Sequence, residues 1–394
     1  MRILLVSSSS GSKGGGELFL LSLGEALAHK GHHVLLWASD HERMNPLCNR
    51  FDRFGEVHRA KYTNTYDRRL RNLTSAIDLP TARRVAAHWR SLKPDIIHLN
   101  KQNLEDAPEL LWAANISRIP AVCSVHVTQD AGHLGARFGK ARDFVARRAL
   151  QSFRGPLVAI GKSRLLDLRR FLRSNEKTVL ISNGVHIPSE ADLRAARTTG
   201  RAKLALRAGQ FLCLGVGRMV EQKRPILFLE CAKKIADRIP DSIFYWVGDG
   251  PLRAQWDRFV DENGLSKRVF VTGWVEDVRP YYAAADLLLH TAAYEGLPLA
   301  LLEAMAAGLP CALTANLMQD FSFLTKEVAI TVEEISDAWT AQVVDVEERR
   351  RRGSASRQIA SSQFSLDRMA DDYERLYWSA MAQSKHAYRV LHSA

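Results

Sequence analysis

Two glutamates eight positions apart form the pattern in this chain that most directly suggests chemistry. They lie in HTAAYEGLPLALLEAMAAGLP (290–310), where Glu295 precedes a Gly-Leu-Pro turn and Glu303 falls in the apolar run that follows. A carboxylate can accept hydrogen bonds from vicinal hydroxyl groups. Taken alone, Glu303 is more simply explained as a helix-surface acid that interacts favourably with the helix dipole.

The segment between the two glutamates predicts the start of a helix. Pro298 suits the first helical position, where its missing N–H costs nothing, and Gly308 followed by Pro310 suits the end. Free backbone N–H groups near Leu299 would then point outward and form an anion site. The turn is therefore a predicted binding place for a negatively charged group.

Two cations that follow a predicted strand form a second candidate. In VGRMVEQK (216–223), Arg218 and Lys223 fall in the loop after an apolar run. Ligands of open α/β sheets bind outside the carboxyl ends of the strands, and Arg and Lys at that edge can hold phosphate oxygens. The alternative is that both are ordinary solvated surface cations.

Other phosphate-binding and metal-binding patterns do not fit. SSSSGSKGGGE lacks the dinucleotide fingerprint, and GPLVAIGKS (155–163) places Gly155 one position too early for a P-loop. No Asp-x-Asp pair and no His/Cys cluster has metal-ligand spacing. We therefore expect a site with no metal and no cofactor, in which the protein itself neutralises any phosphate.

The elements that must position these groups alternate along the chain. Apolar runs typical of strands buried on both faces are followed by helical patterns, which predicts right-handed βαβ units in doubly wound parallel sheets. The predicted strands lie at 2–6, 33–39, 93–100, 120–127 and 156–161, and again at 211–219, 242–250, 268–273, 285–291 and 309–314. The predicted fold class is α/β, with two Rossmann-like domains facing a cleft.

The length and the restart of the pattern predict the domain boundaries. A chain of 394 residues suits two domains, and the segment near 186–208 is polar. We predict an N-terminal domain over 1–186, a C-terminal domain over 187–363 and a final long helix within 364–394.

Composition predicts the compartment. The five cysteines are scattered without a CxxC pair, which favours a reducing environment over a disulfide framework. No apolar run reaches the ~18–20 residues of a membrane span, and MRILLVSSSS is interpreted as a strand and not as a signal peptide. We expect a cytoplasmic location.

The motifs, taken in order, resemble those of one family. EGLPLALLE is similar to the E-x7-E motif of retaining glycosyltransferases with the GT-B fold, most closely those of family four (glycosyl transferases group 1). Further blocks resemble that family in the right order over nearly the whole chain: GGGELFLLSLGEALAHKGHHV, KPDIIHLN, VLISNGVHIP, LGVGRMVEQK, WVGDGPLRAQW and VFVTGWVEDVRPYYAAADLLLH. FSLDRMADDYERLY resembles the family's C-terminal crossover helix, which implies that residues 364–394 pack back on the N-terminal domain.

The resemblance implies a role for each candidate residue. The donor is a nucleotide-diphosphate sugar, UDP- or GDP-linked, bound mainly by the second half. The implied diphosphate contacts are Arg218, Lys223, the N–H groups near Leu299 and the loop of Gly14 and Gly15, while Glu303 contacts the ribose and Val275, beside Trp274, lies in the base-binding segment. The implied catalytic residues are Glu295, which contacts the transferred sugar, and His126, which positions sugar and phosphate. On the residues alone, His126 is explained as a satisfied core histidine.

The implied reaction is metal-independent, retaining transfer of a sugar to a hydroxyl of a glycan, lipid-linked or small-molecule acceptor in bacterial cell-surface polysaccharide or glycolipid synthesis. Two alternatives are a catalytically diverged sugar-nucleotide-binding protein and an epimerase or phosphorylase of the same fold. The first gains support from residues 315–329, a loop that contains no glycine where the family shows a Gly-Gly turn. Because left-handed conformations are costly for other residues, the path of that loop must differ here.

The excess of positive over negative charge lies in the half that the resemblance assigns to the acceptor. Residues 1–200 carry 31 Lys/Arg against 18 Asp/Glu, whereas residues 201–394 carry 24 against 25. This indicates either a solvated basic surface or an anionic partner, namely an acceptor or a membrane. Nucleic acid is not expected, because no recognition motif is present.

A basic segment offers a specific form of the membrane hypothesis. Within 136–173, an apolar stripe could lie on an anionic bilayer at the inner face of the plasma membrane, or the helix could simply pack on its own sheet. The residues of that stripe are Phe138, Ala141, Phe144, Val145 and Leu150, beside Arg137, Lys140, Arg147 and Arg148.

Overall fold

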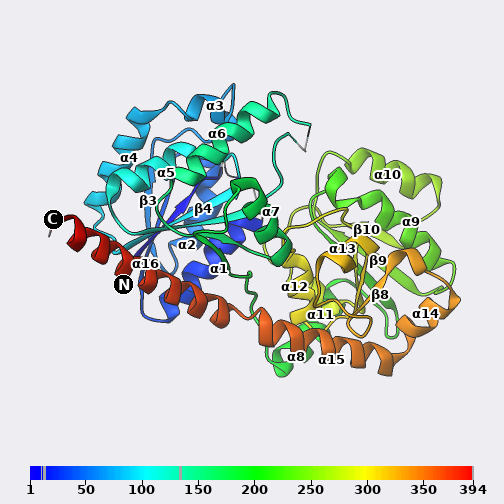
Figure 1. Cartoon of the computed structure of the whole chain (residues 1–394). Helices are drawn as coiled ribbons and strands as arrows, with labels where there is room; N and C mark the ends of the chain where they lie inside the picture. Colours follow the sequence, from blue (N-terminus) through cyan, green and yellow to red (C-terminus); the bar gives the residue numbers. More distant parts are fainter. Residues whose placement is uncertain (10, 12–14, 133–134, 393–394) are drawn as a thin grey trace. The chain divides into compact units, whose positions relative to one another are not determined.

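The structure, a computed structural model of the chain, describes all residues except 10, 12–14, 133–134 and 393–394 (Figure 1). The chain divides into two compact units. The first comprises Met1–Gly184 together with Leu366–Ala394, and the second comprises Val185–Ser365.

A seven-stranded parallel sheet forms the centre of the first unit, in the order β3-β2-β1-β4-β5-β6-β7. Its strands are β1 (Arg2–Ser7), β2 (His33–Ser39), β3 (Glu56–Ala60), β4 (Ile96–Asn103), β5 (Ala121–Val127), β6 (Leu157–Ala159) and β7 (Thr178–Leu180). Ile3 of the central strand β1 pairs with Val34 on one side and Ile96 on the other. This double pairing explains the continuous apolar run of β1, because both faces of a central parallel strand are buried.

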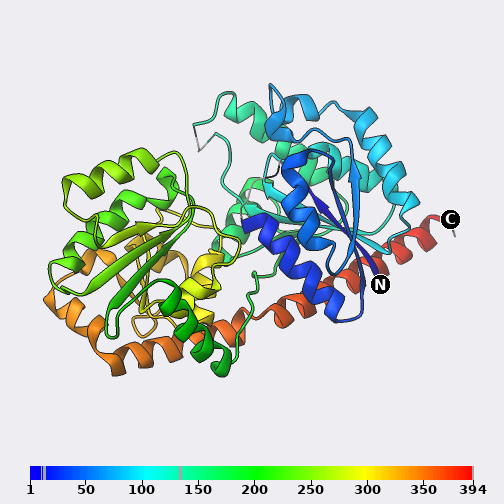
Figure 2. The same ribbon diagram turned by 180° about the vertical axis from the view of Figure 1, so that it is seen from behind.

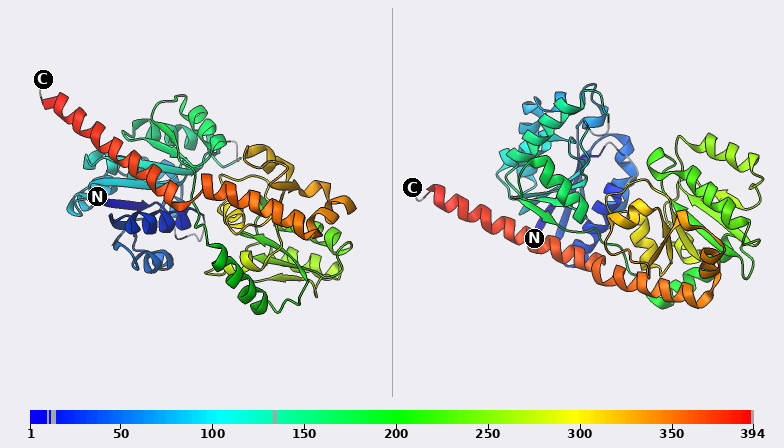
Figure 3. Two further views of the ribbon diagram at one scale, coloured as in Figure 1. Left: turned by 90° about the horizontal axis from the view of Figure 1, so that it is seen from below. Right: turned by 45° about the vertical axis from the view of Figure 1, so that its right-hand side comes forward.

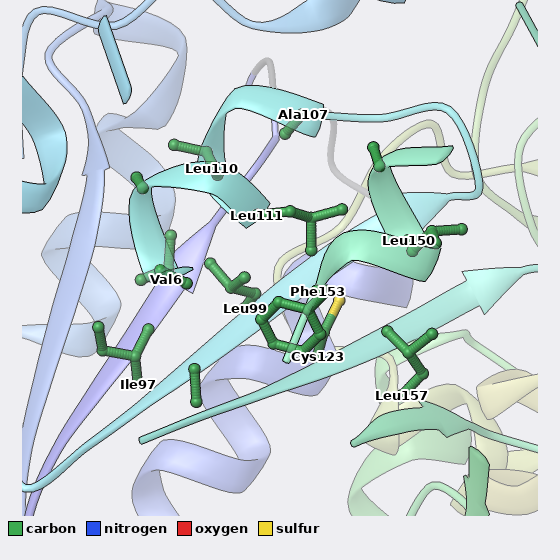
Figure 4. Packing of buried hydrophobic residues seen from close by; sticks show 14 of the residues in the cluster. Val6, Ile97, Leu99, Ala107, Leu110, Leu111, Cys123, Leu150, Phe153 and Leu157 are labelled. Carbon is green, nitrogen blue, oxygen red and sulfur yellow. The ribbon is translucent and has the colours of Figure 1, made fainter. Parts of the chain in front are cut away.

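Helices cover both faces of this sheet (Figures 1 and 2). They are α1 (Gly15–His29), α2 (Asn45–Phe51), α3 (Asn72–Ser75), α4 (Leu79–Ser91), α5 (Pro108–Ser117), α6 (Gly139–Ser152), α7 (Lys162–Leu172) and α16 (Leu366–His392). Side chains from α4, α5, α6 and α7 share one core with the sheet, and those from α1, α2 and α16 share the core on the other face. Figure 4 shows part of the first core, where Leu111 of α5 points toward the strands that carry Leu99 and Cys123.

The C-terminal helix α16 belongs to the first unit and packs beside α1 (Figure 3). Buried hydrogen bonds connect it to the sheet: His98 Nδ1 lies 2.6 Å from the Tyr377 hydroxyl, and the Tyr373 hydroxyl lies 2.8 Å from Ser124 Oγ. Burial lowers the pKa of His98 to about 3, so this network is uncharged at neutral pH.

The second unit has a six-stranded parallel sheet in the order β10-β9-β8-β11-β12-β13. Its strands are β8 (Phe211–Val216), β9 (Ser242–Val247), β10 (Val269–Val271), β11 (Leu287–His290), β12 (Cys311–Leu313) and β13 (Ala329–Thr331). Its helices are α8 (Glu190–Lys203), α9 (Pro225–Ala236), α10 (Arg253–Glu262), α11 (Arg279–Ala284), α12 (Leu299–Ala306), α13 (Ala315–Asp320), α14 (Asp337–Val344) and α15 (Val346–Gln363). Residues of α9, α10 and α14 pack in one core against this sheet.

Both sheets are parallel and carry helices, which confirms the predicted α/β class. The polar segment 186–208 contains α8, a helix whose N-cap Ser189 accepts a hydrogen bond from the Asp192 N–H. The predicted loop over 315–329 is wrong in its first part, because Ala315–Asp320 form α13, whereas residues 321–328 lie outside helices and strands. No residue of 315–329 has a positive φ, in agreement with the expected cost of left-handed backbone there.

Within the described ranges of the chain, no helix combines the length and the apolar composition that crossing a membrane requires.

Candidate functional site

Lys223 and Glu295 form a buried ion pair at the carboxyl edge of the second sheet. Lys223 ends a short 3-10 helix (Glu221–Lys223) after β8, and Glu295 lies between β11 and α12. The ammonium contacts Glu295 Oε1, and the two side chains are only 17% and 9% exposed. The structure thus joins two groups that the sequence placed 72 positions apart and predicted for different parts of a ligand.

The charge state of Glu295 follows from its neighbours. Burial acts to raise the pKa of this carboxyl, but the charge of Lys223 and the adjacent imidazole of His290 outweigh burial and lower it to about 2. His290 ends β11, with Nε2 3.5 Å from Glu295 Oε1, and burial lowers its own pKa. Glu295 is therefore an ionised carboxylate at neutral pH, beside a neutral histidine.

Hydrogen bonds hold the two partners in place. Thr291 Oγ1 donates to the carbonyl oxygens of Lys223 and Arg224 at 3.1 and 3.0 Å. The side-chain amide of Gln222 donates to the Tyr294 carbonyl at 3.0 Å, and the Ala293 N–H donates to the Gln222 carbonyl at 2.8 Å. The loop that carries Glu295 is therefore tied to the turn that carries Lys223.

Arg218 lies in the loop that follows the carboxyl end of β8, and it is exposed. It follows Gly217, whose φ is 154°; a Cβ there would lie 3.3 Å from Lys223 Cδ, so the lysine stem passes over this backbone. Among the described residues, no ion pair of the Arg218 guanidinium is found. Arg218 is thus an available cation close in the chain to a lysine that is already neutralised.

Helix α12 begins at Leu299, one residue later than predicted. Pro298 is its N-cap, with an extended backbone, and no side chain caps the helix there. The N–H groups of Leu301 and Leu302 bond to the Pro298 carbonyl, whereas Leu299, at the very first position, has no carbonyl within the helix to bond. Gly308, with φ 73°, follows the helix end as predicted.

Glu303 is not a free surface acid. It is half-buried on α12, and its Oε2 accepts a hydrogen bond of 2.9 Å from the hydroxyl of Tyr282 on α11. Burial raises the pKa of Glu303 to about 7, with a smaller upward contribution from Asp277. Tyr282 and His290 are site residues that the sequence analysis missed. Tyr282 lies 21 positions before Glu303 and on another helix, and His290 lies at the end of β11, shortly before the loop that carries Glu295.

Val275 lies in the loop between β10 and α11 and is half-buried, next to Trp274, which is 51% exposed. The same loop carries Asp277, whose charge acts on Glu303. The segment predicted to face the base therefore lies on the side of the site where Glu303 is found.

The remaining predicted residues belong to the first unit. His126, near the end of β5, is buried, and its Nε2 lies 2.6 Å from Asn100 Oδ1; burial lowers its pKa to about 4. The amide nitrogen of Asn100 donates to the carbonyl of Gly16 at 3.1 Å, next to Gly15, which opens α1. Asn100, also missed from sequence, thus links His126 to the glycine segment, while Gly14 lies outside the described residues.

The candidate residues of the second unit are carboxylates, cations and the neutral His290, and those of the first unit include the neutral His126. In the part of the chain that the structure describes, no three His, Cys, Asp or Glu side chains are gathered as a metal ion would require.

Two family models match the chain and together span most of it. The one described as "Glycosyl transferase 4-like domain" matches residues 14–184, and the one described as "Glycosyl transferases group 1" matches residues 210–346. Both matches fall on the two units that carry the site residues.

Curated relatives match over shorter lengths. An Escherichia coli protein, UDP-Gal:alpha-D-GlcNAc-diphosphoundecaprenol alpha-1,3-galactosyltransferase, is 37% identical over 139 residues, which are 34% of this chain and 36% of that protein. The alpha-monoglucosyldiacylglycerol synthase of Acholeplasma laidlawii is 24% identical over 58% of this chain and 60% of its own length. The matches thus span less than two thirds of these relatives.

Solved structures match over nearly the whole chain. Anabaena HepE, crystallised with UDP and glucose, is similar with a TM-score of 0.74 and 21% identity, covering 95% of this chain and 98% of that one. A sucrose-phosphate synthase from Thermosynechococcus elongatus is similar at the same TM-score and identity, over 97% of this chain and 100% of that one. These likenesses establish the architecture, namely the GT-B fold.

Proposed function

This chain belongs to the family-four (group 1) glycosyltransferases of the GT-B fold, and on that premise we propose that it moves a sugar, with retention, from a nucleotide-diphosphate sugar to an acceptor hydroxyl. The acceptor is a glycan, a lipid-linked saccharide or a small molecule of bacterial cell-surface polysaccharide or glycolipid synthesis. The observation that carries the proposal is the buried Lys223–Glu295 pair, with the exposed Arg218 shortly before Lys223 in the chain and the uncapped start of α12 shortly after Glu295.

A diphosphate fits this arrangement by charge. Arg218 supplies a planar fork for two phosphate oxygens, Lys223 a point charge, and the N–H of Leu299 a donor at a helix N-terminus. When the diphosphate forms an ion pair with Lys223 in place of Glu295, the Glu295 carboxylate can accept hydrogen bonds from hydroxyls of the transferred sugar. A UDP-linked donor is supported by relatives whose names or structures carry UDP-sugars, and a GDP-linked donor is the alternative.

The nucleoside end is assigned to the other acid. Glu303 accepts hydrogen bonds from the ribose hydroxyls through Oε1, the oxygen that is not bonded to Tyr282. The backbone near Val275 contacts the base. Because burial raises the pKa of Glu303 to about 7, part of the population is protonated at neutral pH and can also donate one hydrogen bond.

The reaction follows from these positions. The bond between the anomeric carbon and the diphosphate oxygen breaks, and the acceptor oxygen bonds to the same face of that carbon. The acceptor proton passes to the leaving phosphate. Negative charge grows on the leaving group, so preorganised cations and N–H donors accelerate the step. Neutral His126 and the loop of Gly14 and Gly15 are proposed to position sugar and phosphate. Because the proposed reaction needs no metal ion, we expect an excess of EDTA to leave the rate unchanged.

The protein is proposed to act in the cytoplasm at the inner face of the plasma membrane. One alternative activity keeps a specific observation in its favour: α13 occupies the segment where relatives of this family have a glycine turn, as in a protein that binds sugar nucleotides without turnover. Epimerisation or phosphorolysis is the other alternative, and the products distinguish it.

Product analysis tests the proposal. The full chain is incubated with a panel of UDP- and GDP-sugars and with short saccharide and polyprenyl-diphosphate-saccharide acceptors. NMR then reads the anomeric configuration of the product. We expect one donor to give a product whose anomeric configuration is the same as that of the donor. An inverted configuration would refute retention, and binding without any turnover would support the diverged alternative.

A further inference from the structure

We infer that Asn100 is a positioning residue for His126: it holds the imidazole with its proton on Nε2, so that Nδ1 accepts a hydrogen bond from a hydroxyl of the transferred sugar. Asn100 lies in β4 and His126 in the neighbouring strand β5, where Asn100 pairs with Ser124. Because His126 is two positions beyond Ser124, its side chain lies on the same face of the sheet as that of Asn100. The inference rests on the proposed function, and it narrows the role proposed there for His126.

The backbone of α1 fixes which way the Asn100 amide faces. Its Nδ2 donates a hydrogen bond of 3.1 Å to the Gly16 carbonyl. A carbonyl oxygen can only accept, so the amide nitrogen must face Gly16 and the amide oxygen must face away from it. This partner decides between the two orientations, which the shape of an amide alone leaves open. The oxygen, Oδ1, therefore faces His126, whose Nε2 lies 2.6 Å away.

The orientation of the amide decides where the proton of His126 lies. Oδ1 carries no hydrogen, so the hydrogen of this bond must come from Nε2. Burial lowers the pKa of His126 to about 4, and the ring therefore holds only one proton at neutral pH. With that proton on Nε2, Nδ1 is an unprotonated acceptor. The contacts that lead from the Gly16 carbonyl through Asn100 thus specify one tautomer.

The surroundings of the ring favour its neutral form. Among the described residues, the titratable side chain whose pKa responds to His126 is His98, two positions before Asn100 on β4. Burial lowers the pKa of His98 to about 3, so this neighbour is uncharged at neutral pH. The aromatic ring of Phe19 lies on the same side, with its centroid 4.8 Å from that of the His126 ring. A neutral histidine and a phenyl ring offer an imidazolium no counter-ion.

Helix α1 also holds the imidazole in place. Phe19, only 2% exposed, meets the ring of His126 edge-on at an angle of 71°. Gly16 permits the close approach of α1 to β4, because a Cβ at this position would clash with the side-chain amide of Gln102. A rotation that exchanged the two ring nitrogens would break the bond to Asn100 and leave its buried Oδ1 without a donor, which is costly. The ring is therefore fixed in orientation as well as in tautomer.

Nδ1 is the nitrogen of His126 that remains for a ligand. In the part of the chain that the structure describes, no hydrogen bond to it is found, yet it is not one of the fully buried polar atoms that lack a partner. It therefore keeps access to solvent, although the whole residue is only 7% exposed. An unprotonated nitrogen accepts from a hydroxyl, whereas phosphate oxygens without a proton have nothing to donate to it. A sugar hydroxyl fits this atom, and the diphosphate does not.

Long-range ¹H–¹⁵N NMR of the full chain with ¹⁵N-labelled histidine tests the tautomer without any ligand. The signals of His126 are identified by their loss in His126→Gln. We expect Nδ1 of the wild type to have the chemical shift of an unprotonated nitrogen, and Nε2 that of a protonated one, at neutral pH. A proton on Nδ1 would overturn the inference.

Asn100→Leu removes the amide and keeps a side chain of similar size. Without Oδ1 to accept from Nε2, the NMR spectrum should show a mixture of both tautomers of His126. The matched control is Asn115→Leu on α5, because the Asn115 amide likewise bridges two backbone groups: it donates to the Ser152 carbonyl at 2.8 Å and accepts the Arg154 N–H at 3.1 Å. The control should match the wild type. A single tautomer that persists in Asn100→Leu, or an equal change in the control, would show that Asn100 does not hold the proton.

The contact with the sugar is tested with the donor that the product analysis identifies, in which each hydroxyl is replaced in turn by fluorine, which cannot donate. At one position we expect kcat/KM of the wild type to fall about tenfold. In Asn100→Leu the same fluorine should cost little, because both changes remove one hydrogen bond. Additive losses at every position would overturn the contact. A failure to turn over any donor would refute the proposed function, and the NMR spectrum would still decide the tautomer.

Discussion

Replacing Glu295 with glutamine removes one charge from the buried Lys223–Glu295 pair while keeping the size of the side chain. Lys223 then remains 17% exposed with only a neutral amide oxygen to accept from it. Removing one partner of a buried pair typically costs about 3–5 kcal/mol. The surviving hydrogen bond places the expected loss of unfolding free energy at the lower end, about 3 kcal/mol.

The pKa of Glu295 leads to the same magnitude. It falls from an ordinary 4.5 to about 2 in the folded protein, and a shift of that size corresponds to about 3 kcal/mol. Because the folded pKa is the lower one, this stability is present above pH ~5 and is lost as the pH falls toward 2. By pH 3.5 about 1.4 kcal/mol of it should already be lost. The glutamine variant has no such contribution to lose.

Urea unfolding at pH 7 and pH 3.5, read by hydrogen exchange in β8 and β11, measures the second unit separately. Between these pH values the wild type should lose about 1.4 kcal/mol more unfolding free energy than Glu295→Gln. Glu190→Gln, which removes a surface pair with Arg194 that is 73% and 77% exposed, should cost less than about 0.5 kcal/mol. An equal pH dependence in wild type and Glu295→Gln would refute the reasoning.

Further predictions concern ligand binding. Arg218→Ala should weaken binding of the nucleotide-diphosphate sugar that the protein uses about ten- to a hundredfold, by loss of charge-assisted hydrogen bonds, with the fold intact, whereas Arg258→Ala on α10 should not. Calorimetry measures both variants, and equal affinities would mean that the site is misplaced. Wild-type affinity for that nucleotide-diphosphate sugar should rise a few-fold from pH 6 to pH 8, because Glu303, whose pKa is about 7, becomes a carboxylate and a stronger acceptor. Glu303→Gln should show a flat profile over that range, and a parallel rise in the variant would assign the effect elsewhere.

The fold was predictable where burial leaves a mark on the sequence. Strands such as β1 and β8 are buried on both faces and read as unbroken apolar runs. The strands missed from sequence, β3, β7 and β13, lie away from the sheet centres, and each is only three to five residues long. A short strand with one neighbour buries little, so its sequence carries little periodic signal.

The candidate site was predictable in its residue types but not in its pairings. A Gly-Leu-Pro turn between two acids is a local pattern, so the start of a helix could be predicted there from neighbouring residues alone. The ion pair of Lys223 with Glu295 depends on two loops that meet only because β8 and β11 are neighbours in the sheet. The hydroxyl of Tyr282 reaches Glu303 from another helix for the same kind of reason, and Asn100 reaches His126 from the neighbouring strand. Such contacts follow from topology, which a single sequence specifies only indirectly.

The most direct test of the central claim is a thermal-shift titration of nucleotide-diphosphate sugars against the wild type and Lys223→Ala. A ligand at 100 times its Kd stabilises the native state by about 2.7 kcal/mol, which is about 5 °C or more for a unit of this size. We predict such a rise for at least one UDP- or GDP-sugar with the wild type and little or none with Lys223→Ala. No rise with any donor, or an equal rise in the variant, would contradict a nucleotide-sugar site built around Lys223 and Glu295.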